Sequence, residues 1–309
     1  MIRKTVGLAA AAVLAVGIGS AATAQAQQTS TTGTTATACA LRLGSVTSNG
    51  AFTSRMINAT SPITVGGVRG TAGVFGAGQV QHISTFNGTL LGAGGETRTG
   101  LTVMGGALYS STFTVDSESQ LDPHYPHNNL RIGGGWGNYR WIEQSVLQPH
   151  DAQNPSRVLL YGQRTDGTTQ RWESNGTGWR TTAGVGGLST VKGIALIGRT
   201  ATTETFLANT RSGSLVTVTW PTKYLAAPTS RVVRTATWQI FEQLIATKCG
   251  TDGTLLLGID RDTKSGYLYA LSHADGNRTV VKSLGKVPLT FSDPQYFRIA
   301  PKYDVLNGG

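Results

Sequence analysis

Two glutamates occupy matching positions in this chain and could act as a pair. Glu143 and Glu242 each precede a glutamine and stand 24 residues before the glycine of a predicted turn, and the same interval before a third such glycine reaches His82. If these positions share one level of the fold, two carboxyl groups face a common space, as glycoside hydrolysis requires of its acid and its nucleophile or base. In the alternative interpretation each glutamate is paired with a nearby lysine or arginine. Because the remaining equivalent positions hold no further acid, we predict no catalytic residue and keep the hydrolase as the alternative.

A second group of residues is suited to binding a sugar. Trp172 and Trp179 flank Glu173 and Asn175 in one short segment. Sugar rings stack on aromatic faces, while neighbouring carboxylate and amide groups bind the hydroxyl groups. We therefore take these four residues as the candidate ligand-binding set. The alternative is that Trp172 packs between neighbouring elements of the core.

The densest group of potential metal ligands is Asp122, His124 and His127. Two histidines three residues apart beside an aspartate have the donor atoms for zinc or a similar ion. Two prolines in the same segment indicate a loop, however, and no helix presents both imidazole rings on one face. We therefore predict no metal site and no cofactor. The sequence also lacks a Gly-x-Ser-x-Gly elbow, a phosphate-binding loop ending in Gly-Lys-Ser/Thr and a Cys-x-x-Cys pair.

A repeated unit indicates the scaffold that must position these residues. Each copy is an alternating apolar stretch, a short glycine-containing turn and a second alternating stretch, which predicts a β-hairpin. A hairpin cannot bury its apolar face alone, so the copies must pack against one another. The pattern predicts an all-β fold, a β-propeller, in which small antiparallel sheets form a ring. The copies are Leu43–Met56, Tyr161–Trp172, Leu207–Val218 and Ile259–Leu271.

The spacing of the turns and the two ends of the chain favour five blades. The predicted turn glycines, 50, 106, 167, 213 and 266, are separated by 46 to 61 residues, which suits four short strands per blade. The segment 294–301 reads as an inner strand with no hairpin after it, whereas the hairpin at 40–56 has no inner strand before it. Pairing the two in one blade would close the ring. Six blades result if residues 132–143 form an extra sheet. The five predicted blades are 294–309 with 39–66, 67–125, 126–185, 186–235 and 236–293.

The stretch Leu160–Trp179 resembles the repeat of tachylectin-type five-bladed propellers, a family of secreted sugar-binding proteins. The shared features are a strand ending in Tyr-Gly, an Asp-Gly turn, a further strand and a Gly-Trp pair that enters the next strand. The resemblance covers one blade well and two others loosely. It implies a lectin with one pocket per blade, each built from aromatic and amide side chains.

The repeats depart from that family at the aromatic position. Five residues beyond the turn glycines, only one copy has an aromatic side chain, so the sequence predicts one or two sites rather than five equal ones. The residues at this position are Arg55, Ser111, Trp172, Val218 and Leu271.

The N-terminal residues predict export. Arg3 and Lys4 precede an apolar run and a small-residue cleavage site ending at Ala26, so residues 1–26 read as a signal peptide, 27–38 as a flexible leader and 39–309 as one domain. No apolar stretch reaches the roughly 20 residues of a membrane span. Loss of the signal peptide lowers the net charge from +10 to +8. The basic residues are scattered, which argues against specific nucleic-acid binding and fits anionic cell-envelope material.

The two cysteines, Cys39 and Cys249, could form a disulfide in an oxidising compartment. The alternative is two separate buried thiols. We expect a secreted, monomeric, non-enzymatic propeller whose partner is a glycan or an anionic cell-envelope polymer. The alternatives are the glycoside hydrolase described above and a protein-interaction scaffold.

Overall fold

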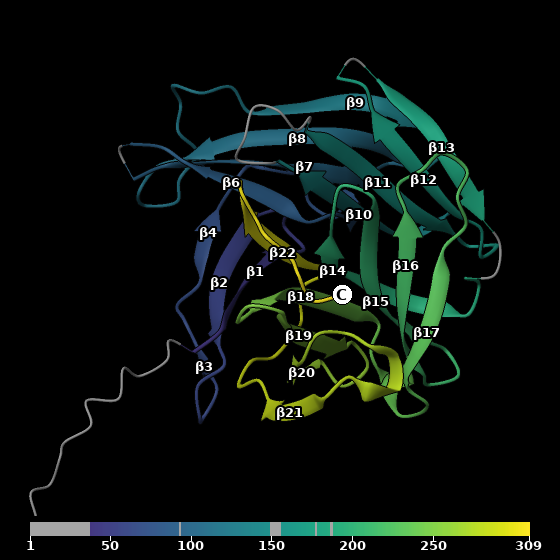
Figure 1. The fold of residues 1–309 in the computed structure, drawn as a ribbon. Coiled ribbons are helices and arrows are strands. Elements are labelled where there is room, and N and C mark those ends of the chain that lie inside the picture. Colours follow the sequence, from purple (N-terminus) through teal and green to yellow (C-terminus); the bar gives the residue numbers. More distant parts are fainter. Residues whose placement is uncertain (1–37, 93, 149–155, 177, 186–187) are drawn as a thin grey trace, which may run out of the picture. The chain divides into compact units, whose positions relative to one another are not determined.

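A computed structural model describes residues 38–309 except 93, 149–155, 177 and 186–187 (Figure 1). The predicted signal peptide and residues 27–37 of the predicted leader lie outside the described residues. Within the described part, the regular secondary structure is almost all β-strand, as the repeat predicted, with two short 3-10 turns, η1 (Trp238–Ile240) and η2 (Gly276–Arg278). None of the helices in this part is long and apolar enough to cross a membrane.

The first sheet combines the two ends of the described chain. Its strands are β1 (Ala40–Val46), β2 (Phe52–Asn58), β3 (Thr64–Val65), β4 (Arg69–Thr71) and β22 (Gln295–Pro301). β1 runs antiparallel to β22, with Leu43 opposite Arg298 and Ser45 opposite Tyr296. The predicted pairing of the C-terminal segment with the N-terminal hairpin is therefore confirmed. Leu41 and Leu43 alternate along β1 and are buried, as a strand with one face on the core requires.

A short parallel pairing between β22 and β6 joins this sheet to the next group of strands. Those strands are β5 (Val80–Ile83), β6 (Phe86–Leu90), β7 (Glu96–Met104), β8 (Ala107–Val115) and β9 (Asn128–Gly134). Both β5 and β6 pair with β7, and Ser84 and Thr85 separate the two strands.

Three further sheets are four-stranded antiparallel meanders in chain order. The first comprises β10 (Tyr139–Leu147), β11 (Arg157–Arg164), β12 (Thr169–Ser174) and β13 (Trp179–Val185). The second comprises β14 (Val191–Arg199), β15 (Thr203–Thr210), β16 (Leu215–Pro221) and β17 (Thr229–Arg234). The third comprises β18 (Gln243–Cys249), β19 (Gly253–Asp260), β20 (Ser265–Leu271) and β21 (Val281–Lys286).

Each of the five groups has one strand nearest the others, which we call its first strand: β22, β5, β10, β14 and β18. These first strands contact one another in a closed cycle. β22 contacts β5, β5 contacts β10, β10 contacts β14, β14 contacts β18, and β18 contacts β22 again (Figure 1). Apolar side chains fill the spaces between neighbouring sheets, for example Leu257, Ile259 and Leu268 against Leu41. The first strands therefore surround a common central space, while the later strands of each sheet lie outside.

Two details differ from the sequence prediction. β9 pairs with β8, so the predicted blade boundary between residues 125 and 126 was wrong. Residues 132–143 are divided between β9, a connection and β10, and they do not form an extra sheet.

The predicted turn glycine Gly266 lies inside β20, where a Cβ atom would come within 2.4 Å of the Phe291 ring. The left-handed residue of this turn is Lys264, with φ of 54°. The alternating pattern locates the hairpin but not the residue that turns it.

The predicted disulfide between Cys39 and Cys249 is confirmed, with the two Cα atoms 5.3 Å apart. It joins the residue before β1 to the last residue of β18, across a sequence separation of 210. A crosslink over so long a loop stabilises the native state by about 3–5 kcal/mol in the chain-entropy model.

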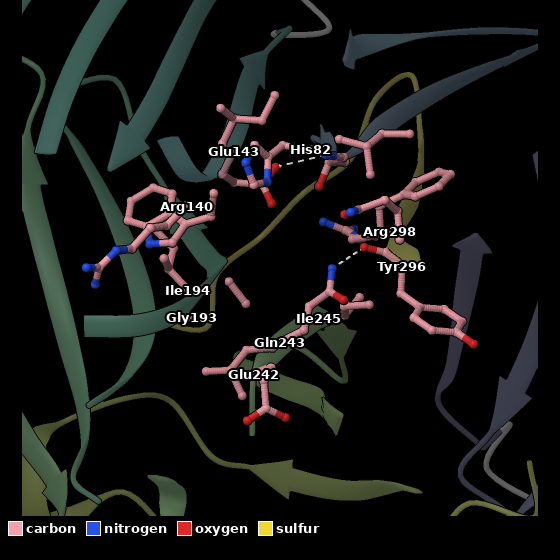
Figure 2. A pocket seen from close by; sticks show the side chains of 18 of the residues that line it. His82, Arg140, Glu143, Gly193, Ile194, Glu242, Gln243, Ile245, Tyr296 and Arg298 are labelled. Carbon is pink, nitrogen blue, oxygen red and sulfur yellow. Dashed lines mark hydrogen bonds between the residues drawn. The ribbon is translucent and has the colours of Figure 1, made fainter. Parts of the chain in front are cut away.

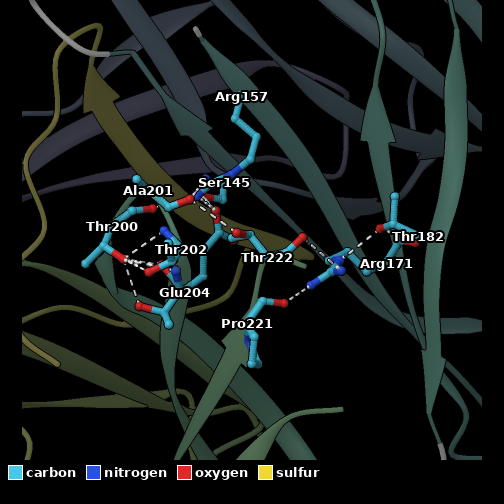
Figure 3. Close-up of polar contacts among 11 residues, drawn as sticks. Ser145, Arg157, Arg171, Thr182, Thr200, Ala201, Thr202, Glu204, Pro221 and Thr222 are labelled. Carbon is cyan, nitrogen blue, oxygen red and sulfur yellow. Dashed lines mark hydrogen bonds and ion pairs between the residues drawn. The ribbon is translucent and has the colours of Figure 1, made fainter. Parts of the chain in front are cut away.

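Buried polar residues also link neighbouring sheets (Figure 3). The side chain of Glu204, on β15, is fully buried and accepts hydrogen bonds from Ser145 at 2.7 Å and from Arg157 at 3.1 Å, both from the β10–β13 sheet. A buried carboxylate is tolerated only with such partners.

Candidate functional site

A groove of about 620 Å³ lies between the outer strands β7–β9 and β11–β13. Three tryptophans line it: Trp136 is buried, whereas Trp172 and Trp179 are only partly buried. The ring centres of Trp136 and Trp172 are 4.8 Å apart, so the first ring supports the second from the core side. The groove thus offers an aromatic wall that solvent reaches.

The pairing of β12 with β13 explains which predicted ligand-binding residues reach this groove. Trp172 and Ser174 are two residues apart on β12 and both line the groove, and Trp179 pairs with Ser174 from β13. Glu173 lies between them, is not part of the groove lining, and forms an ion pair with Arg180 at 3.1 Å. The structure therefore brings Trp172 and Trp179 together and separates Glu173 from them.

Asn175 lies in the turn between β12 and β13 rather than in the groove lining. Its side-chain oxygen accepts a hydrogen bond from the backbone N–H of Gly178 at 2.7 Å. This contact stabilises the turn that places Trp179 at the start of β13.

Sequence reasoning missed two residues of the groove, Trp136 and Arg131. Trp136 lies in the glycine-rich connection between β9 and β10, and Arg131 lies on β9, the strand assigned to the wrong sheet. A tryptophan among glycines was the signal available, since such a side chain needs either a core or a binding surface around it.

A second cavity, of about 380 Å³, lies at the centre of the cycle of first strands (Figure 2). His82 on β5, Glu143 on β10 and Glu242 just before β18 all line it, so the three residues predicted to share one level of the fold share one cavity. Glu143 and Glu242 lie on opposite sides of it (Figure 2).

The two glutamates have different electrostatic surroundings. Glu143 accepts hydrogen bonds from the backbone N–H groups of Gln144 at 2.8 Å and Thr85 at 3.1 Å, and its burial raises the pKa of the carboxyl group. Glu242 accepts from Lys192 at 2.5 Å and from the backbone N–H of Arg261 at 2.7 Å. One carboxyl group is therefore driven towards its protonated form, while the other is neutralised by an adjacent cation.

His82 completes the predicted trio as a neutral imidazole. Burial is the main cause that lowers its pKa, and the positive charge of Arg261 acts in the same direction. The imidazole can therefore exchange a proton only at a pH below the range in which a histidine side chain usually titrates.

Replacing Glu143 with glutamine should stabilise the protein at neutral pH. Because burial raises the carboxyl pKa in the folded state, the native state binds more protons than the unfolded state, and stability falls as pH rises from the unfolded pKa towards the folded one. Glu143→Gln removes this loss but keeps an acceptor oxygen for the two N–H groups. Thermal melting across pH 4 to 8 should show a higher midpoint for the variant only towards the neutral end.

The exposed residue Glu118 supplies the control, because Glu118→Gln removes a carboxylate without touching the cavity. A Glu143→Gln variant less stable than the parent at neutral pH would contradict the assignment of a desolvated carboxyl group.

The residues that the sequence offered as candidate metal ligands, although no metal site was predicted, lie in the loop between β8 and β9. His124 Nδ1 is 2.9 Å from Asp122, and His127 Nε2 is 3.4 Å from the side chain of Asn129. In the part of the chain that the structure describes, no three His, Cys, Asp or Glu residues are grouped as a metal would need. Asp122 and His124 therefore make a local turn contact, to which the described residues add no third ligand.

No family model matches the sequence, and no curated protein matches it. Among solved structures, the chain is similar to the fucose-specific lectin from Aleuria aurantia, with 12% identity and a TM-score of 0.46 over 87% of this chain and 86% of that chain. It is also similar to the lectin SapL1 in complex with alpha methyl fucoside (13%, 0.44, 79% of each chain). A third is the alpha-L-arabinofuranosidase PaAbf62A from Podospora anserina (14%, 0.43, 74% of each chain).

Proposed function

We propose that this protein is a secreted, non-enzymatic, five-bladed β-propeller that binds carbohydrate in the groove between β7–β9 and β11–β13. The observation that carries this proposal is the groove itself, where Trp172 and Trp179 present partly exposed rings beside the polar side chain of Ser174. Sugar rings are bound by such a combination of an aromatic surface and nearby hydroxyl groups.

The propeller assignment rests on the closed cycle of first strands. Each of the five groups has an inner strand that contacts the inner strands of two others, and β22 supplies the inner strand of the group that β1 and β2 continue. A ring closed by both ends of the chain leaves no inner sheet edge open. The blades are the β22 and β1–β4 group, the β5–β9 group, β10–β13, β14–β17 and β18–β21.

A single sugar site fits the differences among the repeats. The position equivalent to Trp172 in the β14–β17 sheet holds Val218, which pairs with Phe206 of β15 as Trp172 pairs with Leu160 of β11, and its side chain is buried. Val218 fills the space between sheets instead of presenting a ring to solvent. The groove beside Trp172 is therefore the one we propose to be occupied.

Export is part of the proposal. The disulfide between Cys39 and Cys249 supports an oxidising compartment, since such bonds persist mainly outside the cytosol. We propose that residues 1–26 direct export and that the mature chain acts as an extracellular monomer.

We propose binding rather than hydrolysis because, among the described residues that line the central cavity, the second carboxylate is already bound by other groups. A glycosidase needs one carboxyl group as acid and another as nucleophile or base. Glu143 has the raised pKa of an acid, but the carboxylate of Glu242 is bound by Lys192 and by the backbone N–H of Arg261.

Removing the aromatic surface should abolish most of the binding. Soluble polysaccharides and a glycan array identify a ligand, and calorimetry then compares the parent with Trp172→Ala and Trp179→Ala. Each substitution should weaken binding by about tenfold to a hundredfold, as for a central aromatic contact. Trp179→Ala should lower the melting temperature only modestly, because Trp179 packs against the cluster around Trp136 but is only partly buried.

Tyr125→Ala is the matched control, because Tyr125 is an exposed aromatic residue of the β8–β9 loop outside the groove. Equal losses in the control and in Trp179→Ala would contradict the site. Failure of the folded parent to bind any glycan would favour the protein-interaction scaffold.

A further inference from the structure

We propose that the ligand of this groove is an acidic glycan and that Arg131 binds its anionic group. The inference rests on the proposed carbohydrate-binding function and assigns the chemical class of the sugar. The shared chemistry is a carboxylate or a sulfate on a sugar ring, since a guanidinium group binds both through parallel hydrogen bonds.

Arg131 is placed for this role by β9. It pairs with Tyr109 of β8, is exposed, and lines the groove that contains Trp172 and Trp179. Within the described residues its guanidinium group makes no hydrogen bond or ion pair. By contrast, Arg171 on the neighbouring sheet donates to several backbone carbonyl groups and is fully buried. Arg131 is thus a cation whose hydrogen-bonding capacity is available to a ligand.

The groove contains no acid that would oppose an anionic ligand. Among the described residues that line it there is no aspartate or glutamate, and Arg131 is the one charged side chain. Glu173, the acid closest in sequence to the groove tryptophans, is paired with Arg180 outside the lining. Without the predicted signal peptide the chain carries a net charge of +8, so the wider field also favours an anion.

The tryptophans of the groove supply further hydrogen-bond donors beside the guanidinium group of Arg131. The indole N–H groups of Trp136, Trp172 and Trp179 make no hydrogen bond within the part of the chain that the structure describes. The indole N–H groups and the guanidinium group donate to no competing partner within the described residues, so they suit a ligand rich in acceptor oxygens. A glycan with carboxylate or sulfate groups supplies both the stacking ring and those oxygens.

Matched pairs of glycans that differ only in charge test the inference. Calorimetry compares oligogalacturonates with their methyl esters, hyaluronan fragments with their carboxyl-reduced forms, and dextran sulfate with dextran. The folded parent should bind the charged member of at least one pair about tenfold or more tightly, with an affinity that falls as salt rises. The pair that shows the difference separates carboxylate from sulfate recognition.

Variants then assign the effect to Arg131. Arg131→Gln should remove the preference for the charged member, so that the variant binds both members of the pair with similar affinity. Arg131→Lys should restore part of it, because the charge remains and the paired hydrogen bonds do not. Lys282→Gln, on β21 outside the groove, removes the same charge and should retain the preference.

Three negative results have distinct meanings. Equal affinity of the parent for the charged and neutral members of every pair overturns this inference and leaves carbohydrate binding intact. Equal loss of the preference in Arg131→Gln and Lys282→Gln overturns the assignment to Arg131. If the folded parent binds no member of any pair and no other glycan, the proposed function fails and the inference fails with it.

Discussion

Replacing Arg171 with leucine should destabilise the protein by about 2–4 kcal/mol. The side chain is fully buried, and its guanidinium group donates to the hydroxyl of Thr182 at 2.9 Å and to the carbonyl groups of Pro221 at 2.5 Å and Lys223 at 2.8 Å (Figure 3). Leucine supplies none of these donors, and each acceptor left without a partner costs about 1–3 kcal/mol unless water reaches it. The guanidinium also stacks on the Trp220 ring, 5.7 Å from its centre, so packing is lost as well.

The substitution acts on the junction between two sheets. Arg171 lies on β12, whereas its carbonyl partners lie at the end of β16 and just beyond it. Urea unfolding with the disulfide intact measures the free energy of unfolding, and Arg171→Lys should fall between the parent and the leucine variant because an ammonium group keeps some of the bonds.

Arg164→Leu is the control for loss of an arginine at the surface. The side chain of Arg164 is 43% exposed and forms an ion pair with Asp166 at 3.5 Å, an interaction worth about 1 kcal/mol or less. If the Arg171→Leu and Arg164→Leu variants had the same free energy of unfolding, the role of Arg171 as a buried donor would be contradicted.

The hairpins of this fold could be predicted from sequence for two reasons. Side chains on one face of a strand recur at every second residue, and the turn that joins two strands involves only residues close in sequence. Leu41 and Leu43 show this in β1, and the pairing of β1 with β22 followed from an unpaired hairpin at one end and a lone strand at the other. These features depend on neighbours within one strand or on the need to leave no inner edge open.

The candidate site could be predicted only in part because it is formed between sheets. Trp172 and Trp179 were predicted because they belong to one hairpin, but Arg131 reaches the groove from β9 and Trp136 from the connection between β9 and β10. Glu173 was placed with the tryptophans on proximity in sequence alone, and strand alternation directs it elsewhere. Contacts between sheets depend on how neighbouring blades pack, which no local pattern records.

The segment after β22 contributes more to stability than its lack of regular structure suggests. It continues from β22 towards β14, where Asn307 pairs with Gly198, and Leu306 is buried against the β10–β13 and β14–β17 sheets. Asp304 anchors this segment, since its carboxylate accepts hydrogen bonds from Arg298 at 2.6 Å and from Arg199 at 3.1 Å. All three side chains are at most 7% exposed.

Asp304→Asn should therefore destabilise the protein by about 3–5 kcal/mol, because it leaves two buried guanidinium groups close together without a carboxylate. The control is Asp275→Asn, since Asp275 also lies between two arginines, Arg278 at 3.0 Å and Arg231 at 3.8 Å, but is 44% exposed. That substitution should cost about 1 kcal/mol or less. Adding Arg199→Met to Asp304→Asn should recover part of the loss in urea unfolding, as one unpaired cation is removed. Equal effects of the two aspartate substitutions would contradict the assignment of a buried anchor to Asp304.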